Sequence, residues 1–209
     1  MLFSCGFIIN FVLGGITGVA LAQVPFDVHV HDTYFVVAHF HYIVYGGSVF
    51  VIFSSIYHWF PKFTGKMLNE NLGRFHFIIT FIGFNLCFAP QHWLGLNGMP
   101  RRVAEYDPQF QLINQISSVG ALLMALSTLP FLWNIFQSII YGDEAGDNPW
   151  NALTPEWLTS SPPPVENWEG EAPLVLEPYG YGEKDSNKKN EEVISCLLYT
   201  SDAADEIAS

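Results

Sequence analysis

Charged side chains are scarce in the first two thirds of this sequence. Residues 1–142 contain five lysine or arginine residues and five acidic residues, so this part carries no net charge. The remaining residues hold three lysines against fifteen acids and account for the whole formal net charge of −12. A soluble domain needs a well-charged surface, so residues 1–142 are not expected to form one. No basic stripe is present that could displace counterions, which excludes a nucleic-acid-binding function.

Cysteine is equally scarce, with three residues in 209. Cys5 and Cys87 lie inside apolar runs, and Cys196 lies close to the C-terminus. This number and placement exclude a small domain built on disulfide bonds.

Long apolar runs are what the sequence has in abundance. Each approaches the roughly 20 residues that cross a bilayer as a helix, and small residues recur in them, as close helix contacts in lipid require. Four such runs in series are rare in soluble folds, so buried soluble helices are the less favoured alternative. The sequence therefore predicts an all-α polytopic membrane helix bundle with four transmembrane helices, at about residues 2–22, 34–60, 75–90 and 112–141.

The distribution of cations predicts the orientation of these helices. The loop 61–74 holds three cations and is expected on the cytoplasmic side, with the loops 23–33 and 91–111 outside. Arg101 and Arg102 lie in an outer loop and break this rule, which suggests that their positive charges are paired with negative groups. The acids Glu105 and Asp107 are close in sequence, but a bound anion is the sharper possibility.

The chain divides into a membrane domain, residues 1–142, and a tail. Residues 143–195 are acidic and rich in proline, which is typical of an extended or disordered extension on the cytoplasmic side. The first apolar run lacks the positive flank of a signal peptide, so the start at Met1 is expected to be a truncation point.

Two histidines inside the second apolar run are the main functional signal. His39 and His41 are two residues apart, so on a helix with about 100° per residue they point roughly 200° apart. They cannot share one metal, but each can bind a separate metal on its own side of the helix, as in axial haem ligation. Phe40 would then lie between two cofactors. A lone buried histidine is usually structural, but two in one uncharged span favour function.

His31 and Asp32 form a second candidate site at the outer edge of the same run. A histidine with a carboxylate suits a hard divalent ion, and an interfacial polar pair or helix cap is an equally good interpretation. The other four histidines are expected to have ordinary surface or span-end roles: His29, His58, His76 and His92.

Three motifs resemble subunit I of the haem–copper oxidases, specifically the A-type, cyanobacterial-like cytochrome c oxidases. They occur in the family's order and spacing, and the resemblance covers about residues 6–142. They are His31-Asp-Thr-Tyr-Phe-Val-Val-Ala-His-Phe-His-Tyr42, His58-Trp-Phe-Pro61 and Pro90-Gln-His-Trp-Leu-Gly-Leu-Asn-Gly-Met-Pro-Arg-Arg102.

The resemblance implies a role for each motif residue. His39 is similar to the axial ligand of the high-spin haem, His41 to an axial ligand of the low-spin haem, and Phe40 would lie between the two haems. His31 and Asp32 match ligands of Mg²⁺ or Mn²⁺ at the contact with subunit II. Arg101 and Arg102 match the arginine pair that holds the haem propionates. Asp27 is similar to an acid of the family that lies near those propionates.

The resemblance also implies a larger enzyme. The chain corresponds to the last four of twelve spans of a proton-pumping oxidase that passes electrons from cytochrome c to oxygen. The copper ligands of the family, including a His-Pro-Glu-Val-Tyr segment, do not occur in this sequence, so this part alone is expected to be inactive. Quinol oxidase subunit I, a nitric oxide reductase relative and a non-catalytic membrane fragment are the alternative hypotheses.

The resemblance implies partners and a location as well. They are oxidase subunits II and III, cytochrome c through subunit II, and the bilayer of a bacterial plasma membrane or a thylakoid. The end of the chain has another explanation, because Cys196-Leu-Leu-Tyr-Thr-Ser-Asp-Ala-Ala-Asp-Glu206 resembles the translation of a sequencing adapter. Residues 196–209 are therefore interpreted as an artefact of sequence assembly.

Overall fold

The computed structural model describes residues 1–168, and the assembly-artefact interpretation of residues 196–209 lies outside them. Within the described range all regular elements are helical, and four helices are long and apolar enough to cross a membrane. The prediction of an all-α polytopic membrane bundle is therefore confirmed. The four spans are Leu2–Leu21, Tyr34–Thr64, Glu70–Leu96 and Pro108–Tyr141.

The first two spans are joined by a short helix. Helix α1 (Leu2–Leu21) contains no charged residue, and α2 (Val24–Val30) follows it directly. The second span begins with α3 (Tyr34–Val44), where the Thr33 hydroxyl accepts a hydrogen bond from the Phe35 N–H at 3.2 Å. That capping bond satisfies one of the free N–H groups of the first turn.

A π-helical turn, η1 (Tyr45–Val49), divides the second span. It contains adjacent glycines, Gly46 and Gly47, and leads into α4 (Phe50–Thr64). One extra residue in this turn shifts the phase of α4 relative to α3. The turn thus lies immediately after the segment that carries the two predicted haem ligands.

The third span is longer than the apolar run that predicted it. Helix α5 (Glu70–Leu96) begins at an Asn69 cap, whose side chain accepts from the Leu72 N–H at 3.0 Å. Its first turns include an exposed ion pair between Glu70 and Arg74 (2.9 Å), and Pro90 lies inside the helix. The charges and the proline, which bounded the expected span at 75–90, are therefore part of the helix.

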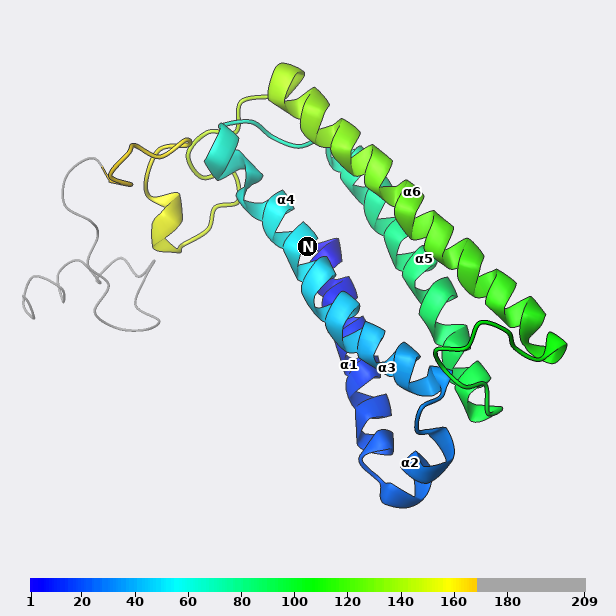
Figure 1. Cartoon of the computed structure of the whole chain (residues 1–209). Helices are drawn as coiled ribbons and strands as arrows, with labels where there is room; N and C mark the ends of the chain where they lie inside the picture. The colour runs from blue at the N-terminus through cyan, green and yellow to red at the C-terminus, as the bar shows by residue number, and fades with distance from the viewer. Residues whose placement is uncertain (169–209) are drawn as a thin grey trace, which may run out of the picture. The chain divides into compact units, whose positions relative to one another are not determined.

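Helices α5 and α6 (Gln111–Tyr141) run side by side in Figure 1 and form the most extensive helix–helix contact. Two glycines allow this approach: a Cβ added to Gly83 would lie 3.0 Å from the Gly120 carbonyl oxygen. Between the helices, the buried Thr80 hydroxyl donates to the Ser127 hydroxyl at 2.8 Å. Small residues and a polar bridge replace the hydrophobic driving force that is missing between helices in lipid.

The core of the bundle is aromatic. Phe50 and Phe84 are fully buried and lie 5.6 Å apart in an edge-on arrangement. Many outward side chains are apolar and exposed, as a lipid-facing surface requires. This core fixes α3 between α1 and α5, which positions the two histidines of α3.

Residues 61–66 and 144–168 form a second compact unit. It contains a short 3₁₀ turn, η3 (Pro155–Trp157), which ends at the buried Trp157. The part of the acidic tail before residue 169 is thus folded into turns, whereas the sequence favoured an extended or disordered segment. Its proline-rich composition is compatible with this structure because turns require little regular hydrogen bonding.

Candidate functional site

The imidazole of His39 is oriented by helix α1. Its Nδ1 atom lies 3.0 Å from the Gly14 carbonyl oxygen and 3.0 Å from the Thr17 hydroxyl oxygen. The Thr17 hydroxyl itself donates to the same carbonyl at 2.9 Å. A carbonyl oxygen can only accept, so Nδ1 carries the proton and Nε2 of the neutral ring keeps its lone pair. This is the tautomer that metal-bound histidines usually adopt when a carbonyl orients them.

A glycine gives this ring the space that it needs. A Cβ added to Gly18 would lie 2.9 Å from Cε1 of His39, which is closer than real Cβ contacts. The neighbouring Gly15, by contrast, has open space at its Cβ position. The small residues of α1 therefore have different roles, and Gly18 serves the close approach of the imidazole.

His41 is oriented by its own helix. Its Nδ1 lies 2.8 Å from the Val37 carbonyl oxygen, so the ring adopts the same tautomer as His39. The ring stacks on Phe88 of α5, with centroids 4.1 Å apart and an interplanar angle of 14°. The Phe40 ring also stacks on the His41 ring, with centroids 4.3 Å apart.

The two histidines use opposite sides of α3, as their spacing predicted. His39 contacts Gly14 and Thr17 of α1, whereas His41 contacts Phe88 of α5. Among residues 1–168, neither Nε2 atom has a hydrogen-bond partner. No group of three or more His, Cys, Asp or Glu side chains that could hold a metal ion occurs in that range either. The two rings therefore lie against different helices, and each is oriented through its Nδ1 atom.

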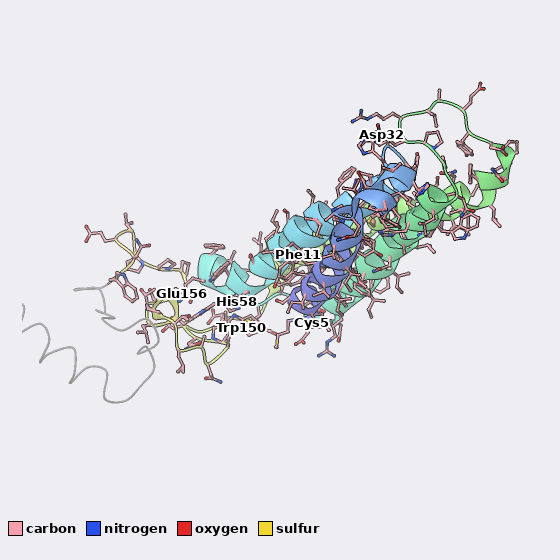
Figure 2. All side chains as sticks on the ribbon, turned by 90° about the horizontal axis from the view of Figure 1, so that it is seen from below. Cys5, Phe11, Asp32, His58, Trp150 and Glu156 are labelled. Atoms are coloured by element: carbon pink, nitrogen blue, oxygen red, sulfur yellow. The ribbon has the colours of Figure 1, made fainter. Side chains whose placement is uncertain are left out.

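Asp32 and Arg101 connect the start of the second span to the loop that follows α5. The Arg101 Nε donates to the Asp32 Oδ1 at 2.8 Å, and its Nη2 donates to the same oxygen. The backbones also meet, because the Arg101 N–H donates to the Asp32 carbonyl at 2.9 Å. The guanidinium hydrogen bond is the main reason why the pKa of Asp32 lies below its ordinary value. Figure 2 shows Asp32 at the end of the bundle away from Cys5.

The partner of Arg101 is therefore not one of the acids nearest in sequence. Arg101 forms its ion pair with Asp32 and not with Glu105 or Asp107. Asp107 instead caps the turn η2 (Pro108–Phe110) by accepting a hydrogen bond from the Gln109 N–H at 3.0 Å. Arg102 is exposed and has a positive φ of 64°. The Asp32–Arg101 pair could not be read from the sequence, since its members are 69 positions apart.

His31 lies between two carboxylates at the same edge. Its Nε2 is 3.4 Å from the Asp32 Oδ2, and its Nδ1 is 3.7 Å from the Asp27 Oδ2. Both His31 and Asp32 are largely exposed, with 65% and 61% of their side chains accessible. The structure thus brings His31 and Asp32 together on an open surface, where water or another chain can reach them.

His76 and Asn134 are two buried polar residues whose roles the sequence did not indicate. His76 is fully buried, and its Nδ1 lies 3.1 Å from the Tyr57 hydroxyl. The Asn134 amide exchanges two hydrogen bonds of 2.9 Å with the backbone of Asn69. Neither residue belongs to a periodic polar pattern, so no sequence signal marks these contacts.

These features define a polytopic membrane protein whose second span carries two imidazoles, each hydrogen-bonded to a backbone carbonyl through Nδ1. In comparisons with protein families, residues 1–123 match the family described as cytochrome c and quinol oxidase polypeptide I. The chain belongs to this family.

Curated relatives agree with that assignment. Cytochrome c oxidase subunit 1 of Synechocystis sp. is 56% identical over 95% of this chain and 36% of its own length. The same subunit of Thermostichus vulcanus is 58% identical over 87% of this chain and 33% of its own length. The chain thus spans about a third of the length of these relatives.

The structural comparison supports the same fold. A haem–copper terminal oxidase dimer solved by electron cryo-microscopy matches with a TM-score of 0.60 at 22% identity. The match covers 68% of this chain and 26% of that one.

Proposed function

We propose that this chain is part of the catalytic subunit of a terminal respiratory oxidase. The complete enzyme would reduce oxygen to water with electrons from cytochrome c and would pump protons across the membrane. The observation that carries the proposal is the pair of oriented imidazoles on α3, His39 and His41. The names of the curated relatives favour cytochrome c over quinol as the electron donor.

The residues of α3 fit two haem groups. When bound, haem and the copper centre supply the electron-transfer and oxygen chemistry, and the copper ligands would lie in other parts of the subunit. His39 would ligate the high-spin haem and His41 the low-spin haem, each through its Nε2 lone pair. Gly14 and Thr17 would hold the ring of His39, while Phe88 would hold that of His41. Phe40, 39% exposed beside His41, would occupy the space between the haems.

Arg101 and Arg102 fit the role of holding the haem propionates. The hydrogen bonds of Arg101 to Asp32 use Nε and Nη2, which leaves Nη1 to donate to an anion. Arg102 presents a second guanidinium next to it. Their positive charge would favour the reduced haem, because reduction adds negative charge nearby.

His31 and Asp32 fit two positions of a Mg²⁺ or Mn²⁺ site. Two adjacent ligands around an ion with bonds of about 2.1 Å lie about 3 Å apart. The observed 3.4 Å between the His31 Nε2 and the Asp32 Oδ2 is close to that separation. Water and subunit II would supply the remaining ligands, which agrees with the exposure of both side chains.

The membrane domain would be residues 1–142, and the acidic segment 143–195 would lie on the cytoplasmic side. Spans alternate in direction, so the cation-bearing loop after the second span and the end of the fourth span share one side. The hydrogen bond from the Met67 N–H to the Asp143 carbonyl (2.9 Å) supports this placement. Subunits II and III would be partners, in a bacterial plasma membrane or a thylakoid.

Replacing each histidine in the intact oxidase tests the proposal. In His41→Ala we expect loss of the low-spin haem absorption, and in His39→Ala loss of the high-spin signal. The matched control is His29→Ala, because His29 is an exposed histidine of α2 that lies outside the second span. Normal haem content and spectra in both α3 variants would refute the assignment.

A further inference from the structure

Lys62 is a buried cation in the last turn of α4. Only 5% of the residue is exposed, and its ammonium contacts residues 147–160 of the same compact unit. A lysine is rarely buried unless its charge is satisfied. Lys66, four residues later, is partly exposed, so the environment of Lys62 is specific to its position.

Three backbone carbonyls surround this ammonium. Its Nζ lies 2.8 Å from the carbonyl oxygen of Thr159, 3.1 Å from that of Asp147 and 3.3 Å from that of Ser160. An ammonium has three N–H donors, so each donor has one acceptor. The ring of Trp157 covers a further side, with its centroid 5.0 Å from Nζ. An aromatic face at this distance attracts a cation.

The cage is braced by hydrogen bonds of its own. The Asp147 side chain accepts from the Ser161 N–H at 3.1 Å, and the Ser161 hydroxyl donates to the Asp147 carbonyl at 3.2 Å. The Asn148 side chain exchanges bonds of 2.9 Å and 2.8 Å with the backbone of Ala152. These bonds fix the two ends of the segment that supplies the carbonyls.

We propose that residues 147–160 form a binding cage for a primary ammonium and that Lys62 is its resident ligand. The lysine thereby locks the segment that follows α6 to the end of α4. The acceptors are carbonyl dipoles that converge on one point, which suits a compact ammonium. A guanidinium directs its donors outward in a flat fork and fits such a point poorly.

Amine acylation of the native full chain in nanodiscs tests the cage without any substitution. We expect the Lys62 amine to react at least about tenfold more slowly than that of Lys66, because reaction requires the cage to open. Mass spectrometry of the modified peptides gives both rates in one sample. Equal rates would overturn the proposal.

Chemical rescue tests the ligand class. In Lys62→Ala we expect chymotrypsin to cut after Trp157, which is 2% exposed in the native chain, at least about tenfold faster. Added ethylammonium should slow this cleavage again, whereas tetramethylammonium should not, because it has no N–H donor. Lys66→Ala is the matched control and should keep the native rate.

The outcomes of this rescue separate the possibilities. Rescue by ethylammonium alone supports a cage for a primary ammonium. Equal rescue by both ions, or a native cleavage rate in Lys62→Ala, contradicts it. These results do not depend on haem, so they are separate from the test of the proposed function.

Discussion

The Nδ1 atom of His39 lies 3.0 Å from the carbonyl oxygen of Gly14, so the backbone of one span orients the imidazole of another. The two residues are 25 positions apart. The contact determines both the direction of the ring and the nitrogen that carries its proton. Packing between α1 and α3 is therefore part of the proposed ligand site.

We expect Gly18→Ala to disturb the His39 ring and to reduce occupancy of the high-spin haem. The added Cβ would lie 2.9 Å from the ring Cε1, so the imidazole must move. Haem content and the high-spin absorption of the purified oxidase would measure the loss. Gly15→Ala is the control, because its Cβ meets nothing within 4 Å. Equal spectra in both variants would show that the close approach is unimportant.

The fold could be predicted from sequence because its main determinant is local. Four uncharged apolar runs specify four membrane helices without knowledge of their packing. The ends of the third helix were missed, since Glu70 and Arg74 pair on an exposed helical surface and Pro90 is tolerated inside the helix. Charges and proline indicate helix ends only when the surrounding structure offers no compensation.

The site could be predicted only in part. Helical periodicity was sufficient to place His39 and His41 on opposite sides of one helix. The partners that orient them could not be found this way, because Gly14 contributes a backbone carbonyl and Thr17 is an ordinary small residue of a helix. The Asp32–Arg101 pair was missed because it depends on the long-range meeting of two loops.

We expect Arg101→Gln to lower the midpoint potential of the low-spin haem. Removing a positive charge near the propionates destabilises the reduced state, by an amount on the order of tens of millivolts. A spectroelectrochemical titration measures it. Arg74→Gln is the control, because Arg74 pairs with the exposed Glu70 at the far end of α5. A midpoint unchanged by Arg101→Gln argues against the propionate role.

The same substitution is expected to raise the pKa of Asp32. The Arg101 hydrogen bond is the largest cause of its lowered pKa, so the pKa should return toward the ordinary range of an aspartate. In the native protein the Asp32–Arg101 pair should persist as pH falls below that ordinary range and break only when pH passes the lowered pKa. Infrared titration of the carboxyl band in EDTA-treated protein measures this.

Arg102→Gln provides the comparison for that titration. Among the causes that shift the pKa of Asp32, the charge of Arg102 has the smallest effect. Removal of Arg102 should therefore raise the pKa of Asp32 less than removal of Arg101 does. Equal shifts in the two variants would indicate a general effect of charge and not a specific hydrogen bond.

Gly120→Ala should weaken the contact between α5 and α6. Its Cβ would collide with the backbone nitrogen of Cys87 and would lie 2.7 Å from the Gly83 carbonyl oxygen. Because these are backbone atoms, the helices must separate, at a cost of about 1–3 kcal/mol in the free energy of unfolding. Unfolding in mixed detergent micelles measures this. Ala121→Val, on the exposed side of α6, should have little effect.

Asn134→Leu should destabilise the start of α5. The native amide accepts from the Asn69 N–H and donates to the Asn69 carbonyl, both at 2.9 Å, so leucine leaves two backbone groups without these partners. The expected loss is about 1–2 kcal/mol in the free energy of unfolding, because each hydrogen bond contributes about 0.5–1.5 kcal/mol and water can reach the exposed Asn69.

Hydrogen exchange locates the effect of Asn134→Leu. The peptide that contains Asn69 should exchange faster, while the peptide that contains Asp32 keeps its native rate. Ser138→Ala serves as the graded control, because it removes only the 3.2 Å bond from the Ser138 hydroxyl to the Asn134 side chain. Uniform acceleration across the chain would point to global destabilisation, and native exchange at Asn69 would mean that the amide does not hold the end of this helix.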